Sequence, residues 1–245
     1  MRVVFAGCAG LLLTCLVAQA QEAVIVTATR LNAAAGANAS VLDAATIASR
    51  NPGSIVDLLR DLPNVYVQQS GGRGSVVSLF TRGAKPNFTL VLLDGVKAND
   101  PTNTRGGSYD FSTLDLNDIE RIEFVRGPAS AIYGSDAVGG VLNIISRHGG
   151  PVFDAGANVE GGSFGTVRAS GHVGGPIGGA IANLGIAYTD NGMPVPGSTS
   201  RGLSLDGALA LPEVAGVALS LNGRFSNSVA GSFPDSSGGP PTQGR

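Results

Sequence analysis

The sequence predicts a small α+β domain followed by antiparallel strands of a transmembrane β-barrel that is incomplete in this chain. Short helix-period and strand-like segments mix between residues 31 and 150. After Asn158 the helical periods vanish and apolar residues alternate with polar ones, as in strands with one buried face. Glycine, with 37 of 245 residues, lies within these alternating stretches and shows no collagen period, which indicates β structure with tight turns.

The N-terminus has the features of a secretory signal peptide over residues 1–20. Arg2 supplies a positive charge, Val3–Val17 forms an apolar run, and Ala18-Gln19-Ala20 is a small-x-small cleavage site, so the mature chain is expected to start at Gln21. The rival reading is a membrane anchor, but a spanning helix needs ~20 apolar residues. The signal peptide is therefore the favoured interpretation.

The composition of the mature chain excludes several classes of function. Both cysteines, Cys8 and Cys15, lie in the predicted signal; a lipoprotein signal ending at Cys8 is the rival, but too few residues precede it. Without them, structural disulfides, thiolate catalysis and cysteine-based zinc sites are excluded. Apart from Arg2, 15 basic residues face 18 acidic ones and there is no tryptophan, so no nucleic-acid partner is expected.

No catalytic constellation stands out. His148 and His172 are 24 positions apart and fall in different predicted domains, and there is no G-x-S-x-G elbow. The glycine-rich loop Gln68–Ser75 lacks the lysine and hydroxyl residue of a P-loop. Glu120 and Glu123 share a strand with two arginines and are expected to form ordinary ion pairs. We therefore predict that the protein is not an enzyme and has no cofactor and no metal ion.

The α+β domain is expected to hold two helices and several short strands. The first helix covers Asp43–Arg50, and the second starts at Ser54, which forms a capping-box pattern with Asp57. Its apolar face consists of Ile55, Leu58, Leu59 and Leu62. Asp94-Gly95 signals a tight turn. The strands are predicted over Val65–Val67, Val76–Thr81, Asn87–Leu93, Arg121–Arg126 and Val138–Ser146.

The second half of the chain is expected to form about five strands. The clearest alternation covers Leu203–Leu211 and Val217–Ser226, and weaker alternation covers residues 155–164, 166–175 and 180–189. A length of ~10 residues with period two is typical of strands in a membrane barrel. The segment Gly174–Gly179 reads as a turn. The alternative is a soluble β-sandwich.

Five strands cannot close a barrel. An open edge in the bilayer would leave backbone groups without hydrogen-bond partners. The tail Ser232–Arg245 is polar and proline-rich, as in a loop. We therefore expect an N-terminal fragment, a truncated gene product or an incomplete sequence.

Several short motifs occur in a fixed order between residues 82 and 143. They are Arg82-Gly83, Asp94-Gly95, Arg126-Gly127-Pro128, Tyr133-Gly134 and Gly139-Gly140-Val141-Leu142-Asn143. In this order they resemble the plug domain of the TonB-dependent receptors of the Gram-negative outer membrane. The runs Leu92–Val96 and Ser135–Ala137, with the short N-terminus, look most like the cobalamin receptor branch.

The resemblance implies a domain organisation and a function. A signal peptide (1–20) is followed by a TonB box segment (21–30), a plug domain (31–150) and the N-terminal part of a transmembrane β-barrel (151–245). The family takes up a scarce, bulky ligand such as cobalamin or a ferric siderophore across the cell outer membrane. TonB and its inner-membrane energising complex would be the protein partner, and outer-membrane lipid would surround the barrel.

The resemblance also assigns roles to residues. TonB would bind residues with a Val26-Thr27-Ala28 core, which without the resemblance read as an edge strand or a floppy terminus: Glu22, Ala23, Val24, Ile25, Val26, Thr27, Ala28, Thr29 and Arg30. The motif residues would shape the plug, and Arg82 and Arg126 would dock it to the barrel wall. The ligand would touch two loops through Gln69, Ser70, Arg73, Lys97, Asn99, Asp100, Asn103, Arg105 and Tyr109.

Other functions stay open at this point. The chain could be a stand-alone periplasmic plug-like binding module or a non-functional truncated remnant. A third class is a periplasmic enzyme or adhesin on a β scaffold, against which the lack of convergent acid, base and nucleophile already argues.

Overall fold

The computed structural model describes residues 38–117, 119–194, 198–231 and 243–244. The predicted signal peptide and the predicted TonB box residues 22–30 lie outside the described residues. None of the helices in the described ranges is long and apolar enough to cross a membrane.

The N-terminal domain is built around a five-stranded mixed sheet with the order β1-β6-β7-β4-β5. Its central strand β7 pairs in parallel with β4 and antiparallel with β6, and all seven of its residues are buried. Burial on both faces explains why this strand reads as a nearly continuous apolar run. The bounds are β1 (Ala39–Leu42), β4 (Thr89–Leu93), β5 (Val96–Lys97), β6 (Ile119–Arg126) and β7 (Gly140–Ser146).

Two helices and a separate hairpin complete the core of this domain. Helix α1 (Ala44–Arg50) and helix α2 (Ile55–Arg60) precede the hairpin of β2 (Val65–Gln69) and β3 (Val77–Thr81). The predicted apolar face of the second helix is confirmed, since all four of its residues are buried and pack in one cluster with strands of both sheets. Shorter helical segments are η2 (Pro86–Phe88), η3 (Phe111–Thr113), α3 (Ser130–Tyr133) and η4 (Ser135–Ala137).

The predicted starts of both helices are confirmed, but one of the predicted capping interactions is not formed. Asp43 caps α1, because its carboxylate accepts a hydrogen bond from the Thr46 amide at 2.8 Å. Ser54 precedes α2 in an extended conformation, yet its side chain caps no helical amide. Instead the Ser54 hydroxyl donates to the Asp57 carboxylate at 3.1 Å. The capping box is therefore not formed.

Strand limits in the domain differ slightly from the predictions. The predicted strand from Asn87 starts only at Thr89, because η2 occupies the preceding residues. The predicted strand from Val138 starts at Gly140. The Asp94-Gly95 turn is confirmed: both residues have positive φ, 51° and 82°, as a type I′ hairpin turn requires. Lys97, predicted as the start of a loop, belongs to the two-residue strand β5 after this turn.

Gly140 explains why a glycine pair starts the strand β7. A Cβ atom on Gly140 would lie 2.6 Å from the Val125 carbonyl oxygen, and the φ of this residue is +151°. No other residue type would let β7 approach β6 so closely at this point. The motif glycine therefore sets the register of the central strand pair.

The second half of the chain forms a long antiparallel sheet whose strands follow one another in chain order. The five predicted strands are confirmed, with a short sixth strand and a helical turn, η5 (Ser163–Gly165). Gly174–Ile177 belongs to a strand rather than to the predicted turn. The bounds are β8 (Asp154–Gly161), β9 (Val167–Ile177), β10 (Ala180–Asp190), β11 (Ser200–Ala210), β12 (Ser220–Gly231) and β13 (Gln243–Gly244).

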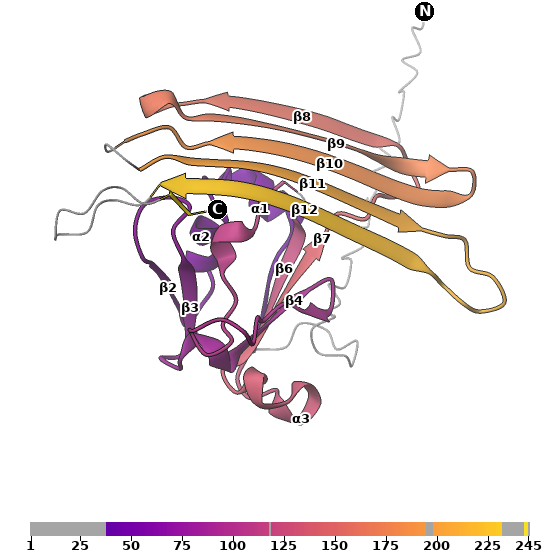
Figure 1. Ribbon diagram of the computed structural model, residues 1–245. Coiled ribbons are helices and arrows are strands. Elements are labelled where there is room, and N and C mark those ends of the chain that lie inside the picture. Colours follow the sequence, from indigo (N-terminus) through magenta and orange to yellow (C-terminus); the bar gives the residue numbers. More distant parts are fainter. Residues whose placement is uncertain (1–37, 118, 195–197, 232–242, 245) are drawn as a thin grey trace, which may run out of the picture.

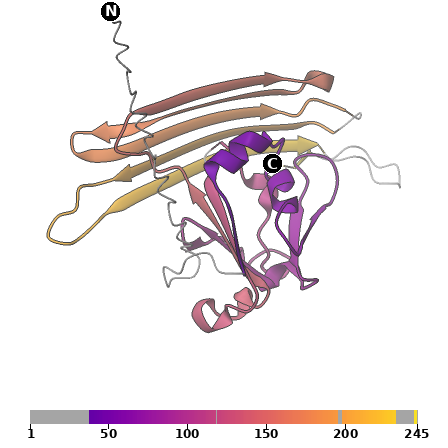
Figure 2. The same cartoon turned by 180° about the vertical axis from the view of Figure 1, so that it is seen from behind.

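The long sheet curves over one side of the N-terminal domain, and we call it the wall (Figures 1 and 2). Helices α1 and α2 lie beside the wall, whereas α3 lies on the far side of the domain. The wall does not close on itself within the described residues, since β8 and β13 are its two edges. One end of the wall carries the connections 162–166 and 191–199, and we call it the Asn191 end. The opposite end, with the turn 178–179, is the Gly178 end.

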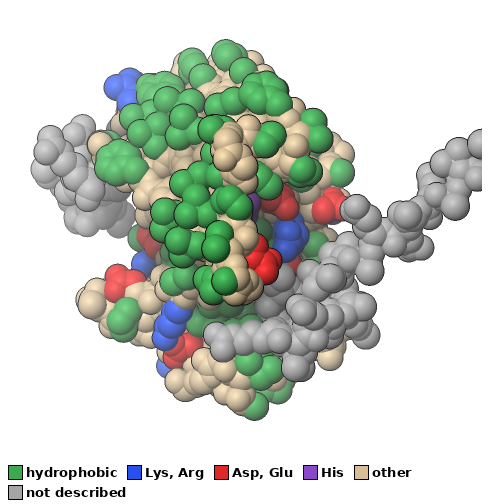
Figure 3. Space-filling model, turned by 90° about the vertical axis from the view of Figure 1, so that its right-hand side faces the viewer, with side chains coloured by type: hydrophobic (Ala, Val, Ile, Leu, Met, Phe, Trp, Pro, Cys, Tyr) green, Lys and Arg blue, Asp and Glu red, His purple; other side chains and the backbone are tan. Residues whose placement is uncertain are grey.

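The two faces of the wall differ in polarity as the alternation predicts. Leu184, Ile186, Leu203 and Leu205 point away from the domain and are exposed. Ser204, which lies between two of these leucines in the sequence, points inward and is buried. Figure 3 shows hydrophobic side chains spread over the wall, with charged and histidine side chains gathered where the wall meets the domain. The sheet therefore presents an apolar face outward and a polar face to the domain.

A charged residue lies at the centre of the N-terminal domain. The Glu123 side chain is fully buried, and one of its oxygens accepts a hydrogen bond from Arg121 Nε at 2.9 Å. The prediction that Glu120 and Glu123 form ion pairs is confirmed, since Arg121 contacts both. The Arg121–Glu123 pair differs from an ordinary surface pair, however. Removing the cation from a buried carboxylate lowers stability far more than removing it from an exposed one.

Arg121→Leu is expected to lower the free energy of unfolding of the domain by about 3 kcal/mol, because it leaves a buried carboxylate without its cation. The double variant Arg121→Leu/Glu123→Leu should recover most of this loss. The measurement is urea unfolding of the detergent-solubilised protein followed by tyrosine fluorescence. Arg50→Leu, which breaks the exposed Arg50–Asp61 pair, is the matched control. Equal losses from Arg50→Leu and Arg121→Leu would contradict the argument.

Candidate functional site

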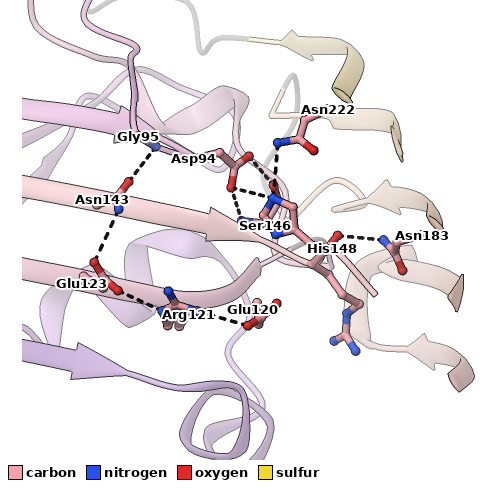
Figure 4. Close-up of polar contacts among 11 residues, drawn as sticks. Asp94, Gly95, Glu120, Arg121, Glu123, Asn143, Ser146, His148, Asn183 and Asn222 are labelled. Carbon is pink, nitrogen blue, oxygen red and sulfur yellow. Dashed lines mark hydrogen bonds and ion pairs between the residues drawn. The ribbon is translucent and has the colours of Figure 1, made fainter. Parts of the chain in front are cut away.

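The candidate site is the interface between the N-terminal domain and the inner face of the wall. At the Gly178 end, the chain leaves β7 and runs directly along the wall before β8 begins. The Asn183 side-chain amide on β10 donates to the Arg147 carbonyl at 3.0 Å. The Asn222 amide on β12 lies 3.3 Å from His148 Nε2. Two successive residues are thus held by two different wall strands (Figure 4).

Close packing of backbones reinforces this attachment. A Cβ atom on Gly149 would lie 2.7 Å from the Ala182 carbonyl oxygen of β10. The connection therefore rests against the strand without an intervening side chain, and its position relative to the wall is fixed.

A polar chain continues from this attachment into the domain (Figure 4). His148 lies 3.8 Å from the Asp94 carboxylate, which also accepts hydrogen bonds from the amide and the hydroxyl of Ser146. The neighbouring Gly95 amide donates to Asn143 Oδ1 at 3.2 Å, and Asn143 lies 3.5 Å from Glu123. The predicted motif residues Asp94, Gly95 and Asn143 thus form one network that joins the turn after β4 to the buried Glu123.

The inner face of the wall carries polar side chains that lie over glycines. The His172 ring covers Gly156 on β8, where a Cβ atom would come within 2.6 Å of the ring. The Asp206 carboxylate on β11 covers Gly185 on β10 in the same way. His172 also contacts Asp154 at 3.0 Å. The His172 and Asp206 side chains therefore lie flat against the wall and leave room for the domain.

Several of these inner polar groups are buried without a hydrogen-bond partner. They include Asn183 Oδ1, Ser204 Oγ and Asp206 Oδ2, all on β10 and β11. An unpaired buried polar atom costs about 1–3 kcal/mol. Per unit of buried area, the contact between wall and domain therefore stabilises the structure less than the apolar core of the domain does.

A cavity of about 430 Å³ lies between the domain and the wall. From the domain it is lined by α1, by residues near the start of α2 and by residues 111–117. From the wall it is lined by charged side chains, such as Glu160, Arg168 and Arg201, and by small hydroxyl side chains. The serines among the latter are Ser170, Ser200, Ser204, Ser226 and Ser228. The domain thus meets this part of the wall without continuous apolar packing.

The first predicted ligand loop, Gln68–Ser75, lies at the Asn191 end, and its first two residues belong to strand β2 rather than to the loop. Its backbone is held by Gly72, whose carbonyl accepts hydrogen bonds from Gln69 Nε2 and from the amide and hydroxyl of Ser75. Ser70 and Arg73 are exposed. Arg73 reaches the wall, where it donates to Asn191 Oδ1 at 3.2 Å. The loop is therefore both compact and attached.

The second predicted ligand loop begins with an internal anchor. Asn99 is buried: its Oδ1 accepts from the Val91 amide at 2.7 Å, and its Nδ2 donates to the carbonyls of Thr89 and Gly107. The Asn103 side chain likewise forms hydrogen bonds with the backbone of the loop, at Ser108, Arg105 and Gly107. These two side chains shape the loop.

The remaining residues of this loop differ in exposure. Lys97 pairs with Asp136 of η4, and this hydrogen bond lowers the pKa of the Asp136 carboxyl. Asp100 is exposed, and the Thr102 hydroxyl lowers its pKa. Burial raises the pKa of Tyr109, which packs edge-on against Phe111. Arg105 lies 3.6 Å from Asp110. Of this set, Lys97 and Asp100 are the exposed residues.

Arg82 and Arg126 lie close together on the side of the domain away from the wall. Arg126 is opposite Gly140 at the start of β7, whereas the wall connection leaves the other end of β7. Its Nε donates to the Asn38 carbonyl at 3.3 Å. Arg82 Nη1 lies 3.7 Å from the place of a Cβ atom on Gly127. The two arginine motifs are therefore neighbours in space, and their docking role stays a prediction.

Other interface residues were missed by the sequence reasoning. Arg147, Asn183, Asn222 and Arg168 join segments far apart in the chain, and no local period or motif marks such residues. His148 and His172, predicted in different domains, both lie at the interface, where His172 is also 3.5 Å from Arg147. Within the described ranges, no group of three or more His, Cys, Asp or Glu residues could hold a metal ion.

Asn99→Ala is expected to disorder the second loop, because it leaves the buried Val91 amide and Thr89 carbonyl without a partner, at a cost of about 2 kcal/mol. Hydrogen exchange of the Val91 amide should accelerate, and proteolysis between residues 100 and 107 should begin earlier. Asp100→Ala is the control, since the side chain of this exposed neighbour accepts hydrogen bonds from the amide and hydroxyl of Thr102. Equal exchange rates in the two variants would show that Asn99 is not an anchor.

Comparison with known proteins agrees with this architecture. The sequence profile of the family described as TonB-dependent Receptor Plug Domain matches residues 32–141. Over 133 residues the chain is 39% identical to the vitamin B12 transporter BtuB of Vibrio cholerae serotype O1, covering 53% of this chain and 21% of the relative. Over 129 residues it is 43% identical to BtuB of Vibrio vulnificus, covering 51% and 21%. The chain thus spans about a fifth of the length of these relatives.

Solved structures show the same fold. The pyoverdine outer membrane receptor FpvA from Pseudomonas aeruginosa is similar with a TM-score of 0.69 and 20% identity, over 80% of this chain and 29% of that chain. The ferric enterobactin receptor PfeA from Pseudomonas aeruginosa has a TM-score of 0.61 and 25% identity, over 79% and 33%. The matched profile identifies residues 32–141 as a plug domain of the TonB-dependent receptor kind, and the motifs and the wall agree with it.

Proposed function

We propose that this chain is the N-terminal part of a transporter that takes up cobalamin across the outer membrane with energy delivered by TonB. The carrying observation is a plug attached to the inner, polar face of a sheet whose outer face is apolar. Identity of 39–43% to vitamin B12 transporters over the plug region supports cobalamin as the ligand. The whole transporter would contain further barrel strands.

The wall suits a bilayer on its outer side. Strands β9 to β12 contain 11 or 12 residues each, which matches the ~9–11 residues of a tilted strand that crosses the hydrocarbon core. Exposed apolar side chains such as Leu184, Ile186 and Phe225 would face lipid. The polar inner face would face the plug, as described above.

The plug would block the barrel until energy is supplied. Residues 22–30 precede β1, which is an edge strand of the plug sheet. An extended segment can add to the sheet edge of another protein through backbone hydrogen bonds. We propose that TonB binds residues 22–30 in this way and that the ligand first binds the two loops at residues 69–75 and 97–109.

Binding and transport, rather than catalysis, are proposed as the activity. The named relatives are transporters and receptors. A ferric siderophore is the second candidate ligand, because the chain is 25% identical to a receptor solved with enterobactin. The two ligands can be separated by direct uptake measurements.

Val26→Pro is expected to abolish uptake while ligand binding persists, because proline removes a backbone donor from the segment proposed to pair with TonB. The measurement is uptake of radiolabelled cyanocobalamin by cells that lack their own receptor, with surface binding measured in de-energised cells. Ala35→Pro, outside the proposed segment, is the control. Uptake of ferric enterobactin in place of cyanocobalamin would reassign the ligand. Recovery of the protein in the soluble periplasm would favour a stand-alone module.

We also propose that Arg82 and Arg126 dock the plug to barrel strands on the α3 side, through bidentate pairs with acidic residues. Replacing both by alanine should make the plug of the membrane-embedded transporter sensitive to protease, with uptake reduced about tenfold or more. Lys85→Ala, an exposed basic residue of the same domain, is the control. An equally resistant plug in the double variant would refute the docking role.

A further inference from the structure

The loop Gln69–Ser75 contacts three different parts of the molecule through a single side chain and a glycine. Arg73 Nη1 donates to the Gly53 carbonyl at 3.4 Å, just before helix α2, and to Asn191 Oδ1 at 3.2 Å, just after strand β10. Gly74 packs directly on the wall, where a Cβ atom would lie 2.5 Å from Ser200 Oγ and 2.9 Å from the Ala230 Cβ. The loop is therefore tied both to the plug interior and to the wall.

Gly53 lies where several charged groups meet. A Cβ atom on Gly53 would lie 3.1 Å from Arg73 Nη2, 3.1 Å from Asp57 Oδ2 and 3.5 Å from Arg168 Nη2. A side chain at this position would crowd the Arg73 guanidinium and the Asp57 carboxylate and would touch the Arg168 guanidinium at an ordinary contact distance. Gly53 is thus the close-approach point between the loop, helix α2 and wall strand β9.

The charges around this point come from both plug and wall. Arg168 on β9 pairs with Glu160 on β8 at 3.8 Å, and it also feels the positive charge of Arg73 and the negative charges of Asp57 and Asp115 from the plug. The Asp57 carboxylate is held by the Ser54 hydroxyl at the start of α2. A shift of the Arg73 guanidinium would therefore change the electrostatic surroundings of α2 directly.

The loop is stiff enough to transmit a shift. Three hydrogen bonds from Gln69 and Ser75 converge on the Gly72 carbonyl, which is adjacent to Arg73. A ligand that displaces the tip of the loop moves Arg73 with it. Because the planar guanidinium serves both acceptors from one nitrogen, a small rotation weakens both contacts together.

We propose that Arg73 is a positioning residue that couples the outer ligand loop to the start of helix α2 and to the β10–β11 connection. Ligand bound on the loop releases Gly53 and Asn191, and the first turn of α2 loosens in response. The coupling to ligand rests on the proposed function, whereas the tether itself does not.

The test is hydrogen exchange of the purified receptor, with and without cyanocobalamin. In ligand-free protein, Arg73→Ala should raise exchange at residues 53–58 by about three- to tenfold, as expected for loss of one hydrogen-bonded tether. Exchange in β4 and β7 should not change. Arg73→Lys, which keeps the charge but loses the planar fork, should give an intermediate effect. Lys85→Ala is the matched control for removal of a basic side chain.

Asn191→Asp supplies a change in the opposite direction. A carboxylate acceptor turns the neutral hydrogen bond into a charge-assisted one, so exchange at residues 53–58 should slow. In the Arg73→Ala background the same substitution should have no effect, which isolates the pairwise interaction. Equal effects of Asn191→Asp in both backgrounds would overturn the tether.

The ligand arm tests the coupling. In the wild-type receptor cyanocobalamin should speed exchange at residues 53–58. In Arg73→Ala, measured at saturating cyanocobalamin, this response should vanish. A response that persists in Arg73→Ala, or a loss of binding without any change in exchange, would overturn the coupling. If the wild-type receptor does not bind cyanocobalamin, the cobalamin proposal fails, and the ligand-free variants still confirm or refute the tether.

Discussion

The pairing of β7 between β4 and β6 is the constraint on which the rest of the structure depends. This strand is buried along its full length, and it is the last strand of the plug before the chain enters the wall. Its start is fixed against β6 by the close approach at Gly140, and its end is fixed to the wall by the bonds at Arg147 and His148. The orientation of the plug is therefore set by one strand that is anchored at both ends. The loops at the Asn191 end take their positions from that orientation.

The interface between plug and wall is built differently from the core of the plug. The core is a continuous apolar cluster that includes Leu58, Leu59 and Phe124. At the interface, single hydrogen bonds, small serine side chains and several unpaired polar atoms replace apolar contact. Such an interface costs little to open compared with the core, because little apolar surface becomes exposed to water. A plug that keeps its own fold while its contacts to the wall change is consistent with this division.

Much of the architecture could be predicted from the sequence, because local patterns carry it. Alternation around Leu203 and Ser204 predicted both the strands and the face that each residue occupies, and Asp94-Gly95 predicted its hairpin turn. The interface could not be predicted in the same way. Arg147, Asn183 and Asn222 meet only after distant strands have paired, so no spacing marks them. Asn99 shows the same limit: the sequence predicts a ligand contact for this polar residue in a polar loop, whereas its three backbone partners become visible only in the fold.

The side chains that lie over glycines on the inner face of the wall have a consequence for how such a protein can change during evolution. His172 occupies the space that a side chain at Gly156 would need, and Asp206 occupies the space above Gly185. Each of these two pairs of positions on neighbouring strands shares the volume of one side chain. A larger residue at either glycine therefore calls for a smaller or displaced side chain at its partner, so the charges at these two places are expected to change through paired substitutions.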